Sequence, residues 1–569
     1  MDKKEKLLNE SNKLPTIAIV GSPSDTFIVT IDILEESSKQ KLLGELVFFL
    51  TYENDDLILS VGQITYIKTL NRWHEEPSFK AVIKRHGKLP HLSDVADNRI
   101  AEITIQSSFK IQEDEITPYK LSNSPSTGAE IKRMSNNILK ILLEDMIKSY
   151  NIEYLGYAYE TDVEIPFWFK HFGKKDGGVG EAYHIGVFGR TGSGKTTTAA
   201  QMIKGYANNS KYMSILILDP QEQFYNNIEI LPNENFENVI KKRGMNYRKI
   251  KIPEDVYLPN DAELFAELLN RSGFIKQVFN ITTPDKQQEM TNAISNYFNS
   301  YINHRGFEFS KSNNKTTLDN LLNKFTEKDN DGKPNSFYLT QVYSSPKDLR
   351  RVVKYVERKR KEDYSSILNS FTEVLRLFKG KQSLDDMVEN IVKNPGNFFI
   401  INLAPKSTKT IRSENIQALL IKLITQKIID IGEELYQQGE KANCLIVMDE
   451  AHRYLNASSP DPRIKELNRK IVDAVRTTRK YGVGYMFITQ TLASIDDEII
   501  KMMRIFAFGY GLTMSNELSA VKQIINDEKA ITFYRSFIDP ASNNKYPFMF
   551  HGPISPLSFT GSPLFIDMK

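Results

Sequence analysis

The sequence predicts an α/β protein: a parallel sheet covered by helices, interrupted by a helical insertion and preceded by a small N-terminal β-barrel. Three observations predict this fold class. A glycine-rich loop follows an apolar strand and opens a helix at residues 184–203. After residue 181, further strands that are apolar on both faces alternate with helices, which is typical of a parallel sheet. Before that point, short β-branched and aromatic runs are separated by Gly, Pro, Asn and Asp.

The bulk composition is that of a globular protein with room for several domains. The chain has 569 residues, of which 40% are hydrophobic and 25% are charged, and this length can bury a large core. The net charge of +3 neither requires nor excludes a nucleic-acid partner, because a whole-chain sum hides a local basic surface. The one cysteine, Cys444, lies in an apolar run, which excludes a disulfide framework and a cysteine metal cluster.

The N-terminus and the hydropathy pattern predict a protein without membrane segments. The first residues, MDKKEKLLNESNK, lack the apolar region of a signal peptide. No apolar stretch approaches the ~18 residues that a transmembrane helix needs. We therefore expect a cytoplasmic location and no membrane partner. Residues 1–12 are expected to form a loose polar leader.

Residues 13–165 are predicted to form a β-rich, barrel-like domain with one helix. Their strand-like runs include TIAIVGSP, DTFIVTIDI, GELVFFLTY and RIAEITIQSSF. The spacing of these runs favours a small antiparallel barrel. Apolar residues at helical spacing over residues 128–150 predict the helix. A glycine-rich turn is expected at residues 171–183.

The second region holds the predicted parallel sheet. We assign residues 166–224 and 395–535 to this core, and residues 225–394, whose patterns are mostly helical, to an insertion. Residues 536–569 contain several prolines and cannot form a regular helix, so we expect an extended C-terminal arm that packs on another surface or subunit. The candidate core strands span residues 185–189, 214–219, 398–403, 444–449, 484–489 and 505–511.

The loop at residues 184–203 matches a phosphate-binding motif. Gly189, Gly194, Lys195 and Thr196 occupy every required position of G-x-x-x-x-G-K-[ST]. Backbone N–H groups surround the phosphate oxygens, Lys195 neutralises the β- and γ-phosphates, and the Thr196 hydroxyl holds Mg²⁺. The sequence therefore predicts binding of a nucleoside triphosphate, taken as ATP, with Mg²⁺. The candidate nucleotide-binding residues are Gly189, Arg190, Thr191, Gly192, Ser193, Gly194, Lys195, Thr196 and Thr197.

A second motif, LIVMDE at residues 445–450, supplies two carboxylates at the end of an apolar strand. Asp449 is the candidate ligand of the Mg²⁺ shell, directly or through water, and Glu450 is the candidate base that orients and deprotonates the attacking water. The alternative is an ordinary strand end followed by a helix cap. His452, which follows in DEAH, is interpreted as structural.

Asp219 is a third carboxylate at a strand end, in SILILD. It could add a ligand near the metal, or it could cap the following helix. A competing assignment makes Asp219 the main Mg²⁺ aspartate. We prefer Asp449 because a second acid follows it directly.

Two further polar positions are candidates for catalysis. Gln490 ends the strand GYMFIT and could sense the γ-phosphate or the attacking water, or could be a plain polar strand end. Arg476, Arg479 and Lys480 precede that strand. In a ring of identical subunits, an arginine here could reach the neighbouring nucleotide, and we favour Arg479. The alternative is a solvated basic helix end that suits the helix dipole.

These motifs resemble those of the HerA-type ATPases of the FtsK–HerA group of P-loop NTPases. The resemblance rests on GRTGSGKTTT, ILDPQEQF, LIVMDEAH and RKYGVGYMFITQ, in this order and at similar spacing. It implies a RecA-like P-loop fold and the residue roles given above, with Arg479 acting in trans. The family often has His-Gly-Glu-Tyr where this chain has Gln221, Glu222, Gln223 and Phe224. An acid is kept and the glycine is lost, so the role of that loop stays open.

The resemblance also implies partners and an activity. It implies a homohexameric ring that threads double-stranded DNA, moves along it with ATP, and works with a NurA-like nuclease or another effector, such as a sirtuin-like or nuclease protein in phage defence. Two alternatives stay open: an ATP-bound scaffold that regulates an effector, and a secretion or conjugation ATPase of the VirB4 type. Basic stretches at residues 241–249, 276–277 and 356–361 are candidate DNA contacts or ordinary solvated faces.

Overall fold

The computed structural model describes residues 2–149, 152–169, 172, 182–226, 230–404, 411–456, 458–558 and 561–568. It forms two compact units. The first contains Met1–Tyr212, Glu229–Gly244 and Gly484–Lys569, and the second contains Met213–Ile228 and Met245–Val483. Most of the glycine-rich turn expected at residues 171–183 lies outside the described residues.

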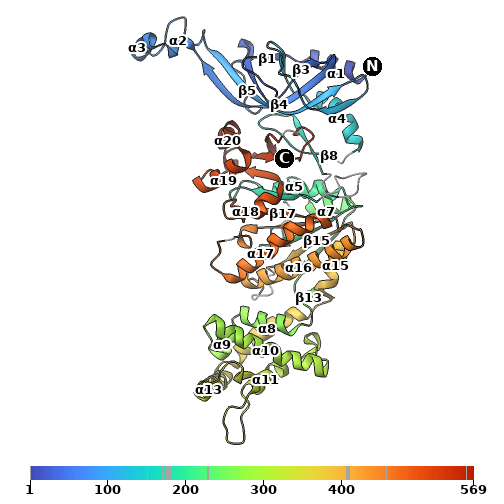
Figure 1. Ribbon diagram of the computed structural model, residues 1–569, viewed down its shortest axis with the longest axis vertical. Coiled ribbons are helices and arrows are strands. Elements are labelled where there is room, and N and C mark those ends of the chain that lie inside the picture. The colour runs from blue at the N-terminus through green and yellow to red at the C-terminus, as the bar shows by residue number, and fades with distance from the viewer. Residues whose placement is uncertain are drawn as a thin grey trace. The chain divides into compact units, whose positions relative to one another are not determined.

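The N-terminal part of the first unit is a closed antiparallel barrel, as predicted (Figure 1). The strand order is β2-β1-β7-β3-β4-β5, and β5 pairs back with β2 to close the barrel, while β6 extends the edge of β5. Alternate residues such as Val29 and Ile31 point into the shared core, as expected for strands with one buried face. The barrel strands are β1 (Thr16–Val20), β2 (Ile28–Ile33), β3 (Leu46–Glu53), β4 (Asp56–Leu70), β5 (Asn98–Ile111), β6 (Ile116–Tyr119) and β7 (Glu130–Arg133).

Two short helices, α2 (Arg72–Glu75) and α3 (Pro77–His86), join β4 to β5. They form one end of the long hairpin of these two strands (Figure 1). None of the residues of α3 is buried. The ring of Trp73 in α2 makes an edge-to-face contact with Phe79 in α3, with 5.6 Å between the centroids.

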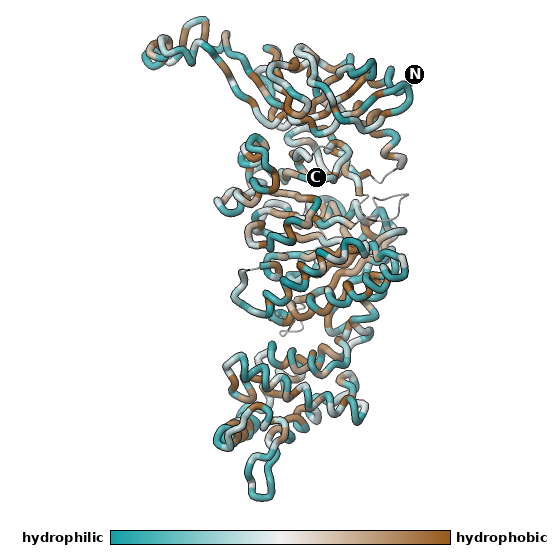
Figure 2. The backbone as a smooth tube through the Cα atoms, viewed as in Figure 1, coloured by the Kyte–Doolittle hydropathy of each residue, from teal (hydrophilic) through white to brown (hydrophobic). Residues whose placement is uncertain are grey.

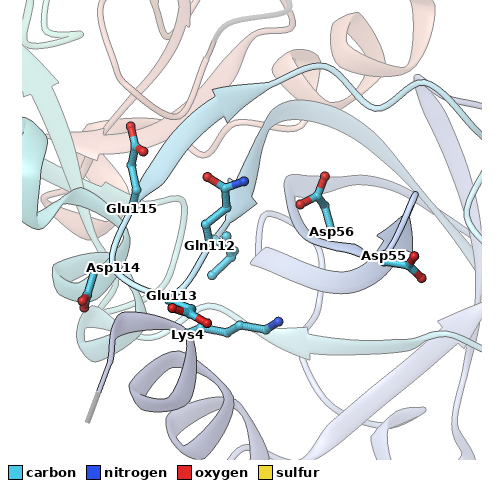
Figure 3. Close-up of a pocket in the computed structure, with 8 residues that line it drawn as sticks. Lys4, Asp55, Asp56, Gln112, Glu113, Asp114 and Glu115 are labelled. Atoms are coloured by element: carbon cyan, nitrogen blue, oxygen red, sulfur yellow. The ribbon is translucent and has the colours of Figure 1, made fainter.

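A hollow of about 560 Å³ lies beside the β3–β4 and β5–β6 turns (Figure 3). Its acidic residues point in different directions (Figure 3). Lys110 lies 2.6 Å from Asp56, and its hydrogen bond lowers the pKa of that carboxyl. Among the described residues, no group of three or more His, Cys, Asp or Glu could hold a metal ion. The lining residues are Lys4, Asp55, Asp56, Ile111, Gln112, Glu113, Asp114 and Glu115.

The first residues form helix α1 (Lys3–Asn12) and are not the loose leader expected from their polarity. The Asp2 carboxylate caps this helix by accepting from the Glu5 N–H at 2.6 Å. Leu7 is fully buried, and Lys132 donates to the Ser11 carbonyl oxygen at 3.1 Å. One apolar anchor and a cap thus order the segment. The helix expected at residues 128–150 is shorter, α4 (Asn136–Ser149), because residues 130–133 form barrel strand β7.

The remaining strands of the first unit follow the order β17-β10-β18-β19-β20-β8-β9. β10 lies between β17 and β18 and pairs with both in parallel. The next pairs, from β18–β19 to β8–β9, are antiparallel. These strands are β8 (Ile152–Ala158), β9 (Glu164–Trp168), β10 (His184–Phe188), β17 (Val483–Thr489), β18 (Met503–Gly509), β19 (Tyr546–His551) and β20 (Leu564–Met568).

The C-terminal segment corrects the expectation of an extended arm at residues 536–569. Strands β19 and β20 form a hairpin that continues the sheet of the same unit beyond β18, in which Phe508 pairs with Met549 and Phe550 with Leu564. Besides α1 to α4, the described helices of this unit are α5 (Lys195–Ala207), α7 (Phe236–Lys242), α18 (Asp497–Met502), α19 (Ser515–Ile525), α20 (Glu528–Arg535) and α21 (Pro540–Asn543).

A buried amide joins the barrel to this hairpin. The Gln63 amide donates to the carbonyl oxygens of Gly44 at 2.7 Å and Phe565 at 2.8 Å, and its oxygen accepts from the Phe565 N–H at 2.9 Å. Gln63 is 1% exposed. All of its polar atoms are therefore used to hold the C-terminal strand on the barrel.

The second unit contains parallel strands in the order β12-β15-β11-β16. Strands β11, β15 and β16 are buried along their whole length, which explains their continuous apolar sequences. Strand β12 is an edge strand with the polar sequence NYRKIK. The elements of this part are β11 (Ser214–Asp219), α6 (Gln223–Asn226), β12 (Asn246–Lys251), β13 (Val256–Tyr257), β14 (Gln382–Ser383), α15 (Leu384–Lys393), β15 (Asn397–Asn402), α16 (Glu414–Gln437), β16 (Cys444–Met448) and α17 (Pro462–Thr478).

The helical insertion begins later than the expected residue 225, because β12 and β13 come first. Hydrophilic and hydrophobic residues alternate along its helices (Figure 2). Phe265 lies in its aromatic core and stacks on Phe309 with 4.3 Å between the ring centroids. The helices are α8 (Ala262–Arg271), α9 (Phe274–Phe279), α10 (Pro284–Arg305), α11 (Asn314–Phe325), α12 (Phe337–Thr340), α13 (Pro346–Glu362) and α14 (Tyr364–Leu375). Among the described residues, no helix combines the length and apolar character needed to cross a bilayer.

Candidate functional site: a phosphate loop and two strand-end acids

The glycine-rich loop joins the fully buried strand β10 to helix α5. Gly192 and Gly194 both have φ of 83°, a left-handed conformation that glycine adopts without strain. Gly194 is the N-cap of α5, and Lys195 is its first residue. The loop therefore turns directly into a helix N-terminus, where unpaired N–H groups and the helix dipole attract anions.

Glycines in the loop also allow close packing that a side chain would prevent. A Cβ atom on Gly189 would lie 2.5 Å from the Ser193 hydroxyl oxygen. A Cβ atom on Gly194 would lie 2.5 Å from the ring of Tyr546. Tyr546 belongs to β19, so the C-terminal hairpin lies against the loop. Sequence reasoning missed this contact, because it gave the C-terminal segment no place in the sheet.

Lys195 lies across the loop. Its side chain is largely buried, and its ammonium group donates to the Arg190 carbonyl oxygen at 3.0 Å. The Arg190 N–H in turn donates to the Tyr510 carbonyl oxygen at 3.1 Å. A buried cation over a loop of left-handed glycines fits a polyphosphate. Thr196 and Thr197, in the first turn of α5, are half-buried.

Gln490 contacts the loop directly. Strand β17 is paired with β10 so that Thr489 lies opposite Phe188, and the next residue of each strand therefore reaches the same edge. The Thr191 hydroxyl donates to Gln490 Oε1 at 2.9 Å. The residue that the sequence suggests as a γ-phosphate sensor is thus hydrogen bonded to the loop that would hold the phosphates.

The two acids of the second unit follow strand β16. Asp449 is 2% exposed and Glu450 is 5% exposed. Glu450 has φ of 49°, which is uncommon for a residue with a side chain and is typical of functional positions. His452, interpreted as structural, lies with Nδ1 3.3 Å from Glu450 Oε2.

Asp219 is a capping residue. Its Oδ1 accepts from the N–H groups of Gln221 at 3.2 Å and Gln223 at 3.0 Å. Its Oδ2 accepts from those of Phe224 at 2.9 Å and Tyr225 at 2.8 Å. Burial raises the pKa of this carboxyl, and the backbone hydrogen bonds act in the opposite direction. Because both oxygens are occupied by backbone donors, the geometry favours the cap over the metal ligand that the sequence left open.

The loop after β11 contains a residue in the left-handed conformation that glycine usually adopts, although the residue is not a glycine. Glu222 has φ of 63°. Its carboxylate accepts from the amides of Asn402 and Asn226, both at 2.8 Å. Asn402 ends strand β15, so Glu222 joins the ends of neighbouring strands. Sequence reasoning singled out Glu222 but not its partner Asn402.

A comparison with protein families finds a match within this core. Residues 182–428 match the family model described as the helicase HerA central domain, DUF87. Residues 182–428 are therefore similar to the central domain of HerA-type helicases. Among curated protein sequences, none matches the chain.

Solved structures match the chain at low sequence identity. VirB4 of Thermoanaerobacter pseudethanolicus is 13% identical, with 68% of this chain and 89% of that chain covered and a TM-score of 0.37. The genome packaging NTPase B204 from Sulfolobus turreted icosahedral virus 2, in complex with ATP-gammaS, is 15% identical over 32% of this chain and 71% of that one, with a TM-score of 0.22. The pCW3 conjugation coupling protein TcpA with ATPgS is 9% identical over 92% and 87%, with a TM-score of 0.27.

The two candidate arginines, Arg476 and Arg479, lie at the end of α17. Arg476 is exposed, whereas Arg479 is half-buried at the start of a 3-10 turn (Arg479–Tyr481). The ammonium group of Lys480 lies 5.5 Å from the ring centroid of Tyr436. The preference for Arg479 as a finger in trans stays a prediction.

The three basic stretches that the sequence suggested as DNA contacts differ in their surroundings. In residues 241–249, Lys241 lies 2.6 Å from Glu237, and Arg243 lies 2.8 Å from Glu153, so part of this charge is paired locally. Residues 276–277 belong to α9, and residues 356–361 belong to α13. The last stretch continues a row of exposed cations in the same helix, namely Lys347, Arg350, Arg351 and Lys354.

Proposed function

We propose that this protein is an ATP-hydrolysing double-stranded DNA translocase that works as a homohexameric ring with a nuclease, NurA-like or other, or with another defence effector. The observation that carries the proposal is the hydrogen bond of 2.9 Å between Thr191 and Gln490. It connects the phosphate loop to an amide at the end of a strand. A motor needs such a connection, because the presence or loss of the γ-phosphate must change the position of the sheet. The HerA-type family match supports the choice of motor class.

The chain's own residues have distinct roles in the proposal. The loop N–H groups and Lys195 bind and neutralise the phosphates. Glu450 orients the attacking water and accepts its proton, Gln490 senses the γ-phosphate, and Arg479 acts on the neighbouring subunit's nucleotide. Mg²⁺, held by Thr196 and Asp449, would neutralise charge on the transferred phosphoryl group.

The first test is the ATPase rate of the purified protein with and without linear double-stranded DNA. Lys195→Ala serves as the blank, because it removes the cation of the loop. We expect DNA to raise the wild-type rate several-fold and to leave the blank unchanged. A rate that is indifferent to DNA contradicts the translocase and favours the scaffold, in which ATP is a structural ligand.

A second experiment separates motor from scaffold. Glu450→Gln should abolish hydrolysis while ATP still binds. A motor with this change loses every DNA-processing activity with its effector. A scaffold with the same change still assembles with the effector and activates it, and that outcome would exclude the translocase.

A further inference from the structure

Helix α13 has one strongly basic face. At 3.6 residues per turn, six exposed cations fall within an arc of about 100° and extend over about 21 Å of the helix. The opposite side is apolar and buried through Leu349, Val352, Val353 and Val356. This apolar side fixes the helix in the insertion (Figure 1) and leaves the basic face toward solvent. The six cations are Lys347, Arg350, Arg351, Lys354, Arg358 and Lys361.

The charge on this face is poorly balanced within the chain. Asp348 and Glu362 lie 3.8 Å from Arg351 and Arg358, respectively, which are long ion pairs at the edge of the arc. In the part of the chain that the structure describes, no carboxylate lies within 4.0 Å of the other four cations. Cations three and four residues apart repel each other and oppose helix formation. The helix therefore carries a destabilising pattern that a polyanion would relieve.

The face has the chemistry of a nucleic-acid surface more than that of a protein interface. Phosphate contacts need Lys and Arg at the surface and read no sequence. The core of a protein interface needs exposed apolar side chains, and within the described residues α13 exposes no large hydrophobic side chain. A DNA duplex carries one negative charge per about 1.7 Å of its axis, so several phosphates can lie beside a row of cations about 21 Å long.

We propose that the basic face of α13 binds the sugar-phosphate backbone of double-stranded DNA. The inference rests on the proposed DNA-dependent function and deepens it, because it assigns the contact to the helical insertion. The face acts as an electrostatic contact that holds the duplex without regard to sequence.

The test measures binding of a fluorescent 40-base-pair duplex to the full-length protein by anisotropy, without ATP, at several salt concentrations. Two variants each remove half of the face: Lys347→Gln/Arg350→Gln/Arg351→Gln and Lys354→Gln/Arg358→Gln/Lys361→Gln. Glutamine keeps the helix propensity and removes like-charge repulsion, so both variants should fold and melt at or above the wild-type temperature. The matched control, Lys311→Gln/Lys333→Gln/Lys381→Gln, loses the same charge from exposed lysines that each lie within 3.3 Å of a carboxylate.

We expect each half-face variant to bind the duplex at least about tenfold more weakly, and to lower the slope of log K against log salt by about 2 to 3, because each lost phosphate contact removes about 0.9. The control should stay within about twofold of the wild type. Equal losses in the control and the half-face variants, an unchanged salt slope, or no duplex binding by the wild type would overturn the proposal. Loss of binding to a single strand alone, with duplex binding intact, would overturn the choice of duplex. DNA-stimulated ATPase activity is measured in parallel. If the protein binds DNA through α13 but DNA does not stimulate its ATPase, the result contradicts the proposed motor function and leaves the proposed binding face intact.

Discussion

The hydroxyl group of Thr191 donates a hydrogen bond of 2.9 Å to Oε1 of Gln490. The first residue lies in the loop after β10, and the second follows β17, the parallel neighbour of β10. A nucleotide that orders the loop would therefore change the surroundings of the amide at once. This hydrogen bond links the phosphate loop to the end of β17, and substitution of either residue can test the link.

Replacing Gln490 by Ala should reduce hydrolysis more than nucleotide binding. Without the amide, the attacking water or the γ-phosphate loses a positioning group, and we expect kcat to fall by roughly tenfold to a hundredfold. The KM for ATP should change by less than about threefold. Thr191→Val is the matched control, since it removes only the loop partner of the same hydrogen bond. Steady-state ATPase assays measure both, and a larger loss in Thr191→Val than in Gln490→Ala contradicts the sensor role.

Glu450→Gln should nearly abolish hydrolysis without loss of fold. The amide keeps the size of the side chain but cannot accept the proton of the attacking water, so a fall in kcat of about a hundredfold or more is expected. ATP binding, measured by fluorescent-nucleotide titration, should stay within a few fold of wild type. His452→Ala, which removes the neighbour 3.3 Å away, should cost much less. If the histidine variant were the slower enzyme, His452 and not Glu450 would be the residue that acts on the water.

Asp219→Ala should lower stability and leave catalysis largely intact. The change leaves four backbone N–H groups without their acceptor, and we expect a loss of about 3 kcal/mol or more. Thermal unfolding should show a lower Tm, while the magnesium dependence of the residual ATPase at low temperature stays unchanged. Asp449→Ala is the contrasting variant. A strong rise in the magnesium requirement of Asp219→Ala would restore the metal-ligand assignment.

The buried strands and the loop could be predicted from the sequence because their physical signals are local. In a run such as LIVMDE, consecutive apolar residues indicate a strand that is buried on both faces, and the two acids follow it directly. The spacing of Gly189, Gly194 and Lys195 likewise indicates a single backbone loop that leads into a helix. Neither signal depends on distant parts of the chain, so both can be recognised without knowledge of the fold.

Other features depend on partners far away in sequence and were therefore missed. Pro547 lies within β19, and proline is uncommon inside sheets, so the segment gave no strand signal. Nothing near Leu7 indicates the pocket that buries it. The polar sequence of β12 is typical of a solvated segment. Its composition is explained by its position at the edge of the sheet, which the sequence does not indicate. For Asp219, the same carboxylate can bind a metal or cap a turn, and only the hydrogen bonds separate the two.

Gln63→Leu should release the C-terminal hairpin from the barrel. The substitution keeps the volume but leaves the Phe565 N–H and the Gly44 carbonyl oxygen without their partner, while the Phe565 carbonyl oxygen keeps its hydrogen bond from the Tyr159 N–H at 3.0 Å. We expect a loss of about 3 kcal/mol, because buried backbone groups would be unsatisfied. Hydrogen exchange should show faster exchange of the β20 amides, and Gln40→Leu on the barrel surface serves as control. Unaltered protection of β20 would mean that its strand pairing holds it without the amide.

The contact between Gly194 and Tyr546 predicts a pair of variants with unequal rescue. Gly194→Ala forces a methyl group to within 2.5 Å of the tyrosine ring and keeps an alanine at φ of 83°, which costs about 1 to 2 kcal/mol by itself. We expect ATP affinity to fall by more than about tenfold. Adding Tyr546→Ala should restore part of the loss by removing the clash, but not the backbone strain. Tyr546→Ala alone should bind ATP more weakly than wild type, because it removes the wall of the loop. Full rescue in the double variant would show that the ring, and not the left-handed backbone, is what requires glycine at this position.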